Sequence, residues 1–121
     1  MSLAQLNVLV VDDDPQILRL LEKVLRPHCA SVLLTTRPFE ALRICEAQPV
    51  DLMITDLVMP EMDGNRLAER VIKLRPEIRV LLISGNHREP TATRHPNVRY
   101  LRKPFFPSWL IDNLRDLLPD L

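Results

Sequence analysis

The chain has no net charge, because 16 lysines and arginines balance 16 aspartates and glutamates among its 121 residues. This balance argues against a nucleic-acid-binding protein that relies on a strongly basic surface. No apolar run approaches the roughly 20 residues that a membrane-spanning helix needs, and the N-terminus shows no signal-peptide pattern. We therefore expect a cytoplasmic protein that neither inserts into a membrane nor binds nucleic acid directly.

Cysteine and histidine are also scarce. The two cysteines, Cys29 and Cys45, have no metal-ligand spacing and lie among apolar residues, which favours reduced thiols that fill space in the core. The three histidines are scattered, and they fit neither a zinc pattern nor an evident pairing with a cysteine or serine. A zinc site and cysteine-based catalysis are therefore poor starting hypotheses.

The chain does have the length and the 46% apolar content of one globular domain, which we expect to span residues 1–121. Short, continuous apolar runs are typical of parallel strands that are buried on both faces. The expected strands are Val8–Val11, Val32–Leu34, Leu52–Ile54, Val80–Ile83 and, more weakly, Val98–Leu101.

Helical patterns separate these runs. Asp14 can cap a first helix that has Pro15 at its first position. The pattern further predicts a helix over Pro38–Ala47, one that starts near Asp63 with Leu67, Val71 and Leu74 on one face, and one from Pro107. Repeated alternation of strands and helices predicts an open α/β sandwich with right-handed crossovers.

Polar side chains stand where the expected strands end. Asp12 and Asp13 follow the first strand, Asp56 the third, Ser84 the fourth and Lys103 the fifth. Ligands of open α/β sheets bind beyond the carboxyl ends of the strands. Carboxylates gathered there favour a hard divalent cation, and Mg²⁺ (or Mn²⁺) suits few carboxylates plus phosphate oxygens. One aspartate can act as the nucleophile of a phosphoryl transfer.

Four segments, "VVDDDP", "ITDLVMPEMDG", "LLISG" and "YLRKPF", resemble in order and spacing the receiver domains of two-component response regulators. The resemblance covers essentially the whole chain. It implies the chemotaxis-regulator-like form of the flavodoxin-like sandwich, with five parallel strands in the order 2-1-3-4-5. It also implies a Mg²⁺-dependent phosphorelay, with a histidine kinase or histidine phosphotransfer protein as the donor. Such a domain promotes its own phosphorylation and dephosphorylation and is not a stand-alone enzyme.

The resemblance implies roles for the acidic residues. Asp56 matches the phosphoacceptor. Asp13 and Asp56 match side-chain ligands of Mg²⁺, Asp12 helps through bound water, and Val58 matches the position that contributes a backbone carbonyl. Asp14, beside a proline, is better explained as a helix cap than as a metal ligand.

The resemblance also implies a switch. Ser84 matches the hydroxyl residue that turns toward the phosphoryl group, and Lys103 matches the lysine that pairs with that group. The Lys103–Pro104 peptide bond is expected to be cis. Tyr100 matches an aromatic residue that turns inward when the serine moves, although it would serve equally as a core tyrosine.

The segment "SGNHREPTATRHPNVRY" departs from the family. Receivers carry a fourth helix here, whereas this chain has Pro90 and Pro96 and little helical periodicity. Because proline inside a helix costs about 3 kcal/mol, we expect a shortened or irregular fourth helix. That helix belongs to the usual dimer face of the family. A homodimer stays open as a partner arrangement, although a shortened helix argues against the family's usual dimer.

Four of the five aromatic residues fall within residues 100–109. Phe105 is expected to fill the core beneath the last helix. Phe106 and Trp109 are harder to bury together, so one of them is expected in an exposed patch that binds a partner.

Two other hypotheses for the function stay open. A receiver-like module can work through binding alone, without phosphorylation. An aspartyl phosphatase of the haloacid-dehalogenase type also has Asp-x-Asp after a strand, but Gln16 stands where that family has threonine, and Asp56 would have no role. The output domain or target is not encoded in any recognisable pattern.

Overall fold

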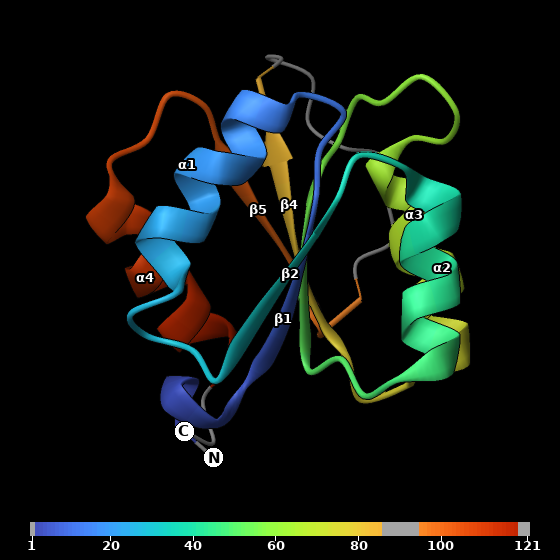
Figure 1. Cartoon of the computed structure of the whole chain (residues 1–121), viewed down its shortest axis with the longest axis horizontal. Helices are drawn as coiled ribbons and strands as arrows, with labels where there is room; N and C mark the ends of the chain where they lie inside the picture. Colours follow the sequence, from blue (N-terminus) through green and yellow to red (C-terminus); the bar gives the residue numbers. More distant parts are fainter. Residues whose placement is uncertain (1, 86–94, 119–121) are drawn as a thin grey trace.

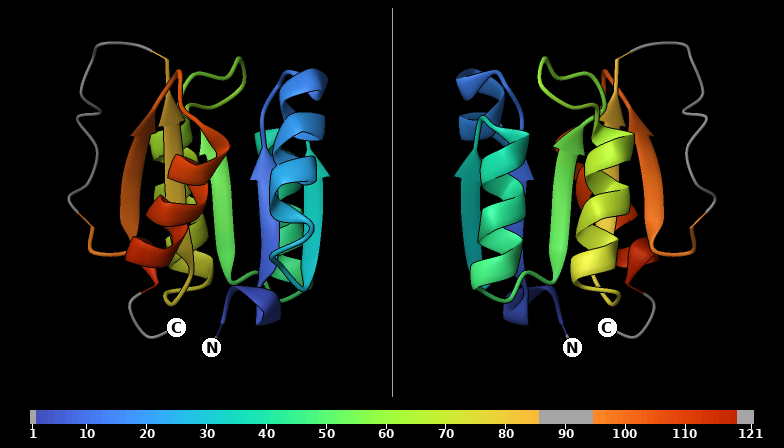
Figure 2. Two further views of the ribbon diagram at one scale, coloured as in Figure 1. Left: turned by 90° about the vertical axis from the view of Figure 1, so that its left-hand side faces the viewer. Right: turned by 90° about the vertical axis from the view of Figure 1, so that its right-hand side faces the viewer.

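One parallel sheet organises the part of the chain that the computed structural model describes, residues 2–85 and 95–118. Its five strands run in the order β2-β1-β3-β4-β5, which confirms the expected order. Figure 2 shows them side by side with their carboxyl ends at one edge. The strands are β1 (Asn7–Val11), β2 (Ser31–Thr35), β3 (Leu52–Asp56), β4 (Arg79–Ser84) and β5 (Val98–Arg102).

Helices cover both faces of the sheet and complete the expected three-layer sandwich (Figure 1). On one face lie α1 (Pro15–Leu25) and α4 (Pro107–Leu117), and on the other lie α2 (Pro38–Ala47) and α3 (Gly64–Leu74). A short 3-10 helix, η1 (Leu3–Gln5), precedes β1. Among the described residues, no helix has the length and apolar character needed to cross a membrane.

Side-chain caps fix where two of the helices begin. The Asp14 carboxylate accepts a hydrogen bond from the backbone N–H of Gln16 at 2.9 Å, immediately before Pro15 starts α1. The Asp63 carboxylate accepts one from the backbone N–H of Arg66 at 2.8 Å at the start of α3. The predicted cap role of Asp14 is confirmed.

The core has two halves, one on each face of the sheet. Along β1, Val8 and Val10 pack toward α1 and α4, whereas Leu9 and Val11 pack toward α2 and α3. All four are buried, as expected for a central strand covered on both faces.

The prediction for the buried face of the third helix is wrong at one residue, Leu74. Leu67 and Val71 are buried, but Leu74 is 43% exposed. It is the last residue of α3, and it lines an open cavity of about 790 Å³ beside Pro49 and Ile78 instead of packing on the sheet. The shortened or irregular fourth helix was expected between β4 and β5, and residues 86–94 of that connection lie outside the described part of the chain.

Candidate functional site

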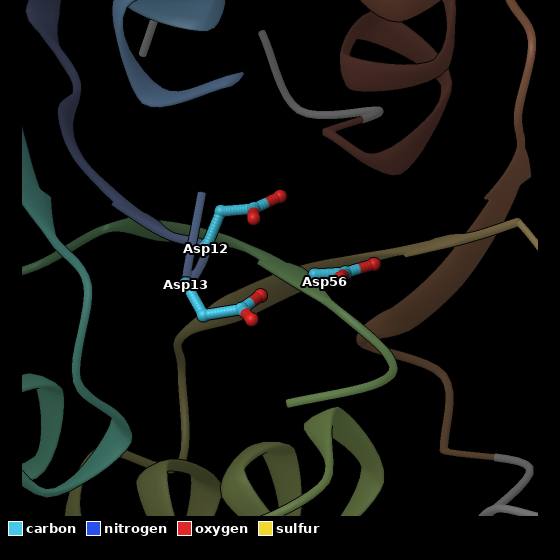
Figure 3. A group of neighbouring side chains, drawn as sticks. All are labelled: Asp12, Asp13 and Asp56. Carbon is cyan, nitrogen blue, oxygen red and sulfur yellow. The ribbon is translucent and has the colours of Figure 1, made fainter. Parts of the chain in front are cut away.

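Three carboxylates meet at the carboxyl edge of the sheet (Figure 3). Asp12 and Asp13 follow β1, and Asp56 ends β3, the strand that pairs with β1. Each of the three offers an oxygen, and these oxygens lie within 4.8 Å of one another. The pairing of Val11 with Thr55 produces this convergence, because it aligns the ends of the two strands. We call these three residues the aspartate cluster.

Asp12 is the buried member of the aspartate cluster. Its burial raises the pKa of its carboxyl from the ordinary value of 3.8 to about 6. The backbone N–H of Asp14, which donates to Asp12 Oδ1 at 2.9 Å, lowers this pKa, and the charges of Asp56 and Asp13 raise it further. Full ionisation is therefore costly without a cation, and three close oxygens are the donor set that a hard divalent cation prefers.

Asp56 is partly buried and lies beside the positively charged side chain of Lys103. Its Oδ1 lies 3.5 Å from the Nζ of Lys103. Burial raises the pKa of Asp56, while the Lys103 ammonium lowers it. The backbone N–H of Lys103 donates to the carbonyl of Ser84 at 2.8 Å, and the Lys103–Pro104 peptide bond is cis. The loop after β5 thus holds the ammonium beside the carboxylate.

Ser84 and Tyr100 lie on the two neighbouring strands β4 and β5. Leu82 pairs with Tyr100, and side chains two residues apart point to the same face, so Ser84 and Tyr100 share the face that α2 and α3 cover. Ser84 is buried. The Tyr100 hydroxyl donates to Asn65 Oδ1 at the start of α3 at 3.4 Å, and burial raises its pKa.

The Tyr100 side chain therefore lies against the start of α3. The side chain of Val58, two residues after Asp56, is exposed. Exposure of this side chain fits the expected role of Val58, in which only its backbone carbonyl takes part.

Gly64, the last residue of the segment "ITDLVMPEMDG", also shapes the site. A Cβ atom at this position would lie 2.4 Å from the carbonyl oxygen of Asp56 and 3.0 Å from the Cα of Leu57. The backbone N–H of Gly64 also donates to the Leu57 carbonyl at 2.7 Å. The start of α3 therefore rests directly on the end of β3, which a larger residue would prevent.

The aromatic residues after Lys103 separate as expected between core and surface. Phe105 packs against the core on the α1 and α4 side. Phe106 is 64% exposed and Trp109 is 47% exposed, and their rings meet edge to face with centroids 4.9 Å apart. Both rings, and not only one, are thus exposed close in sequence to Lys103.

Comparison with known proteins agrees with this geometry. The family model of the response regulator receiver domain matches residues 8–115. The chain therefore belongs to the response regulator receiver domain family of two-component systems. The resemblance inferred from the four sequence segments is confirmed.

Individual relatives differ in length. The chain is 34% identical to the transcriptional regulatory protein GlrR of Escherichia coli (strain K12), with 98% of this chain and 27% of GlrR covered. It is 30% identical to the response regulator receiver protein CpdR of Brucella abortus (strain 2308), with 95% of this chain and 92% of CpdR covered. The chain thus spans about a quarter of the first relative and nearly all of the second.

A solved structure supports the same fold. The response regulator receiver domain protein (CheY-like) from Methanospirillum hungatei JF-1 superposes with a TM-score of 0.83 and 25% identity. The superposition covers 96% of this chain and 95% of that protein.

Proposed function

We propose that this chain is a phosphorylation switch that works in the cytoplasm, with Asp56 as the phosphoacceptor. The main support for this proposal is the aspartate cluster, whose oxygens lie within 4.8 Å of one another. In addition, Lys103 Nζ lies 3.5 Å from Asp56 Oδ1. A carboxylate nucleophile beside a cation site and a fixed ammonium is the arrangement that phosphoryl transfer needs. The donor is a phosphohistidine on a kinase or phosphotransfer protein.

Each residue contributes electrostatics or position to the transfer. A carboxylate oxygen of Asp56 attacks phosphorus while the bond from phosphorus to the donor histidine breaks. Asp13, Asp56 and the Val58 carbonyl would hold Mg²⁺, with Asp12 helping through bound water, and the ion would neutralise charge on the phosphoryl oxygens. Lys103 supplies a second positive charge from the loop after β5. The chain turns over no external substrate other than the phosphodonor.

Phosphorylation with a small donor tests this proposal. The chain is incubated with Mg²⁺ and acetyl phosphate and weighed by mass spectrometry. The wild type should gain one phosphoryl group, and Asp56→Asn should gain none. A gain that survives Asp56→Asn but is lost on changing Asp12 would support a phosphatase-type mechanism instead. The absence of any gain would favour the module that acts by binding alone.

We further propose that Ser84 and Tyr100 carry the signal away from Asp56. They share one face of the sheet, and Tyr100 contacts the first turn of α3 through Asn65. Ser84→Ala should still accept a phosphoryl group but should lose the change that phosphorylation causes in the aromatic NMR signals of Tyr100. If those signals change equally in the wild type and the variant, the coupling is absent.

The exposed pair Phe106 and Trp109 is proposed to contact the protein phosphodonor. The two rings follow Lys103 closely along the chain, and exposed aromatic pairs are typical of interface centres. Trp109→Ala should slow transfer from the cognate phosphohistidine protein about tenfold or more. The same variant should react normally with acetyl phosphate, which needs no protein contact. Leu74→Ala, which removes an exposed apolar side chain at the other edge of the sheet, is the matched control.

A further inference from the structure

A second hollow lies on the α2 and α3 side of the molecule. It has a volume of about 440 Å³, within the range of ligand-binding pockets. Phe39 from the start of α2, Met59 and Met62 from the loop after β3, and Arg66 and Arg70 from α3 line it. We call it the Phe39 groove. None of the residues of the aspartate cluster lines it.

The apolar part of the Phe39 groove is a ready contact surface. Phe39 is 44% exposed, while Met59 and Met62 are buried beneath the groove. Methionine adapts its shape to different ligands. Aromatic residues, methionine and arginine are all enriched at protein interfaces. The lining therefore suits an apolar side chain of another protein.

Three arginines stand against two acids around the groove, because Arg66 and Arg70 line it and Arg37 pairs with one of its acids. Two acids line it, but the Glu61 carboxylate lies 3.4 Å from Arg37 Nε, and the Asp63 carboxylate caps α3. Arg66 and Arg70 are exposed and one helical turn apart, and neither forms an ion pair with another described residue. Two guanidinium groups on one helix face are thus available to carboxylates.

We propose that the Phe39 groove binds an acidic peptide segment of a partner protein. An aromatic or branched apolar side chain of the segment packs on Phe39 and the two methionines, and flanking carboxylates pair with Arg66 and Arg70. Charge complementarity selects this occupant, and the apolar floor favours a peptide over a nucleic acid, whose phosphates would leave that floor unused. The proposal does not depend on phosphorylation of Asp56.

Titration of the full chain followed by ¹H–¹⁵N NMR tests the proposal without Mg²⁺ or a phosphodonor. The probe is a short peptide in which one phenylalanine is flanked by glutamates. It should shift the amide signals of Phe39, the loop that holds Met59 and Met62, and the first turns of α3, and it should do so saturably. A peptide with lysine in place of each glutamate should not bind.

Charge reversal on the rim provides the matched comparison. R66E/R70E should weaken binding of the glutamate peptide at least about tenfold. R43E/K73E makes the same change of net charge on exposed positions of α2 and α3 outside the groove, and should leave binding nearly unchanged. Phe39→Ala should also weaken binding. Equal losses in both double variants, shifts that map elsewhere, or equal competition by an oligonucleotide would overturn the proposal.

Discussion

Three adjacent aspartates at the end of β1 have three different surroundings. Asp12 is buried and accepts a hydrogen bond from the Asp14 backbone, Asp13 is exposed and points its carboxylate toward Asp56, and Asp14 caps α1. Only the first two belong to the aspartate cluster. Repulsion within the cluster is a cost of the metal-free fold that a bound cation would relieve.

Asp12→Asn should stabilise the metal-free protein at neutral pH. The folded chain keeps a proton on Asp12 up to a pKa of about 6, whereas the unfolded chain releases it near 3.8. The free energy of unfolding of the wild type therefore falls as pH rises from about 4 to about 6, and stays lower above that range. The neutral amide avoids this loss, on the order of 1–3 kcal/mol.

Denaturant unfolding at pH 5 and pH 7.5 measures the effect. The advantage of Asp12→Asn over the wild type should be larger at pH 7.5 than at pH 5. Asp112→Asn, at an exposed position of α4, is the control and should show no such difference. An advantage that shrinks with rising pH would contradict the electrostatic cost assigned to Asp12.

Asp13→Ala and Asp14→Ala should separate metal binding from helix capping. The first removes an oxygen of the aspartate cluster and should abolish Mg²⁺-dependent phosphorylation. The second removes the acceptor for the Gln16 N–H and should cost about 0.5–2 kcal/mol of stability. Phosphorylation rates and thermal unfolding of both variants test this division, which fails if Asp14→Ala loses phosphorylation while it keeps full stability.

At the scale of single residues, the sequence pointed to all three members of the aspartate cluster, because Asp12 and Asp13 follow one apolar run and Asp56 stands one threonine after another. The pattern "DDDP" also separated Asp14 from its neighbours, since proline marks the first turn of a helix. It did not reveal Gly64, whose importance depends on the 2.4 Å approach to the Asp56 carbonyl. Such an approach arises only when two elements pack together.

At the scale of elements, the junction of β3 with α3 holds Asp56 in place. The Leu57 N–H donates to the Ile83 carbonyl, and the Gly64 N–H donates to the Leu57 carbonyl, so the loop is tied at both ends. The Thr55 hydroxyl adds a bond to the Asp56 carbonyl at 3.0 Å. The position of Asp56 therefore depends on how closely α3 approaches the strand.

Gly64→Ala should destabilise the fold by about 2 kcal/mol or more, because the added methyl group overlaps backbone atoms of β3. Gly85→Ala is the matched control, since the only described atom that a Cβ there would meet belongs to the Lys103 side chain, at 3.8 Å. Chemical denaturation of the two variants measures the difference. Equal stability of the two would mean that the tight junction has no energetic consequence.

Helix starts were the most predictable elements, because aspartate and proline mark them chemically. The exposed end of α3 was not predicted, since periodicity alone places Leu74 with Leu67 and Val71. Whether the last turn of a helix still lies over the sheet depends on the lengths of neighbouring elements. The Phe39 groove was not foreseen for a similar reason, as its lining comes from two helices and a loop.

At the scale of the whole molecule, the strand order creates the site. The order β2-β1-β3-β4-β5 places β1 beside β3, and the ends of these strands carry the three carboxylates. Lys103 reaches the same edge from β5 by way of the loop that follows it. Residues spread over most of the chain thus form one site only when the fold is complete.

Mg²⁺ should therefore stabilise the whole fold. A ligand that binds only the folded state adds RT ln(1 + [L]/Kd), or about 2.7 kcal/mol at one hundred times Kd. Thermal unfolding in Mg²⁺ and in a chelator should differ for the wild type and should not differ for Asp13→Ala. An equal shift in that variant would indicate that the ion binds outside the aspartate cluster.

The most direct test of the account locates the phosphoryl group itself. The chain is treated with acetyl phosphate and Mg²⁺ and then with borohydride, which reduces an aspartyl phosphate to homoserine, and its peptides are sequenced by tandem mass spectrometry. If Asp56 is the phosphoacceptor, homoserine is expected at position 56 alone, and only when Mg²⁺ is present. Homoserine at position 12 or 13, or modification independent of Mg²⁺, would contradict it.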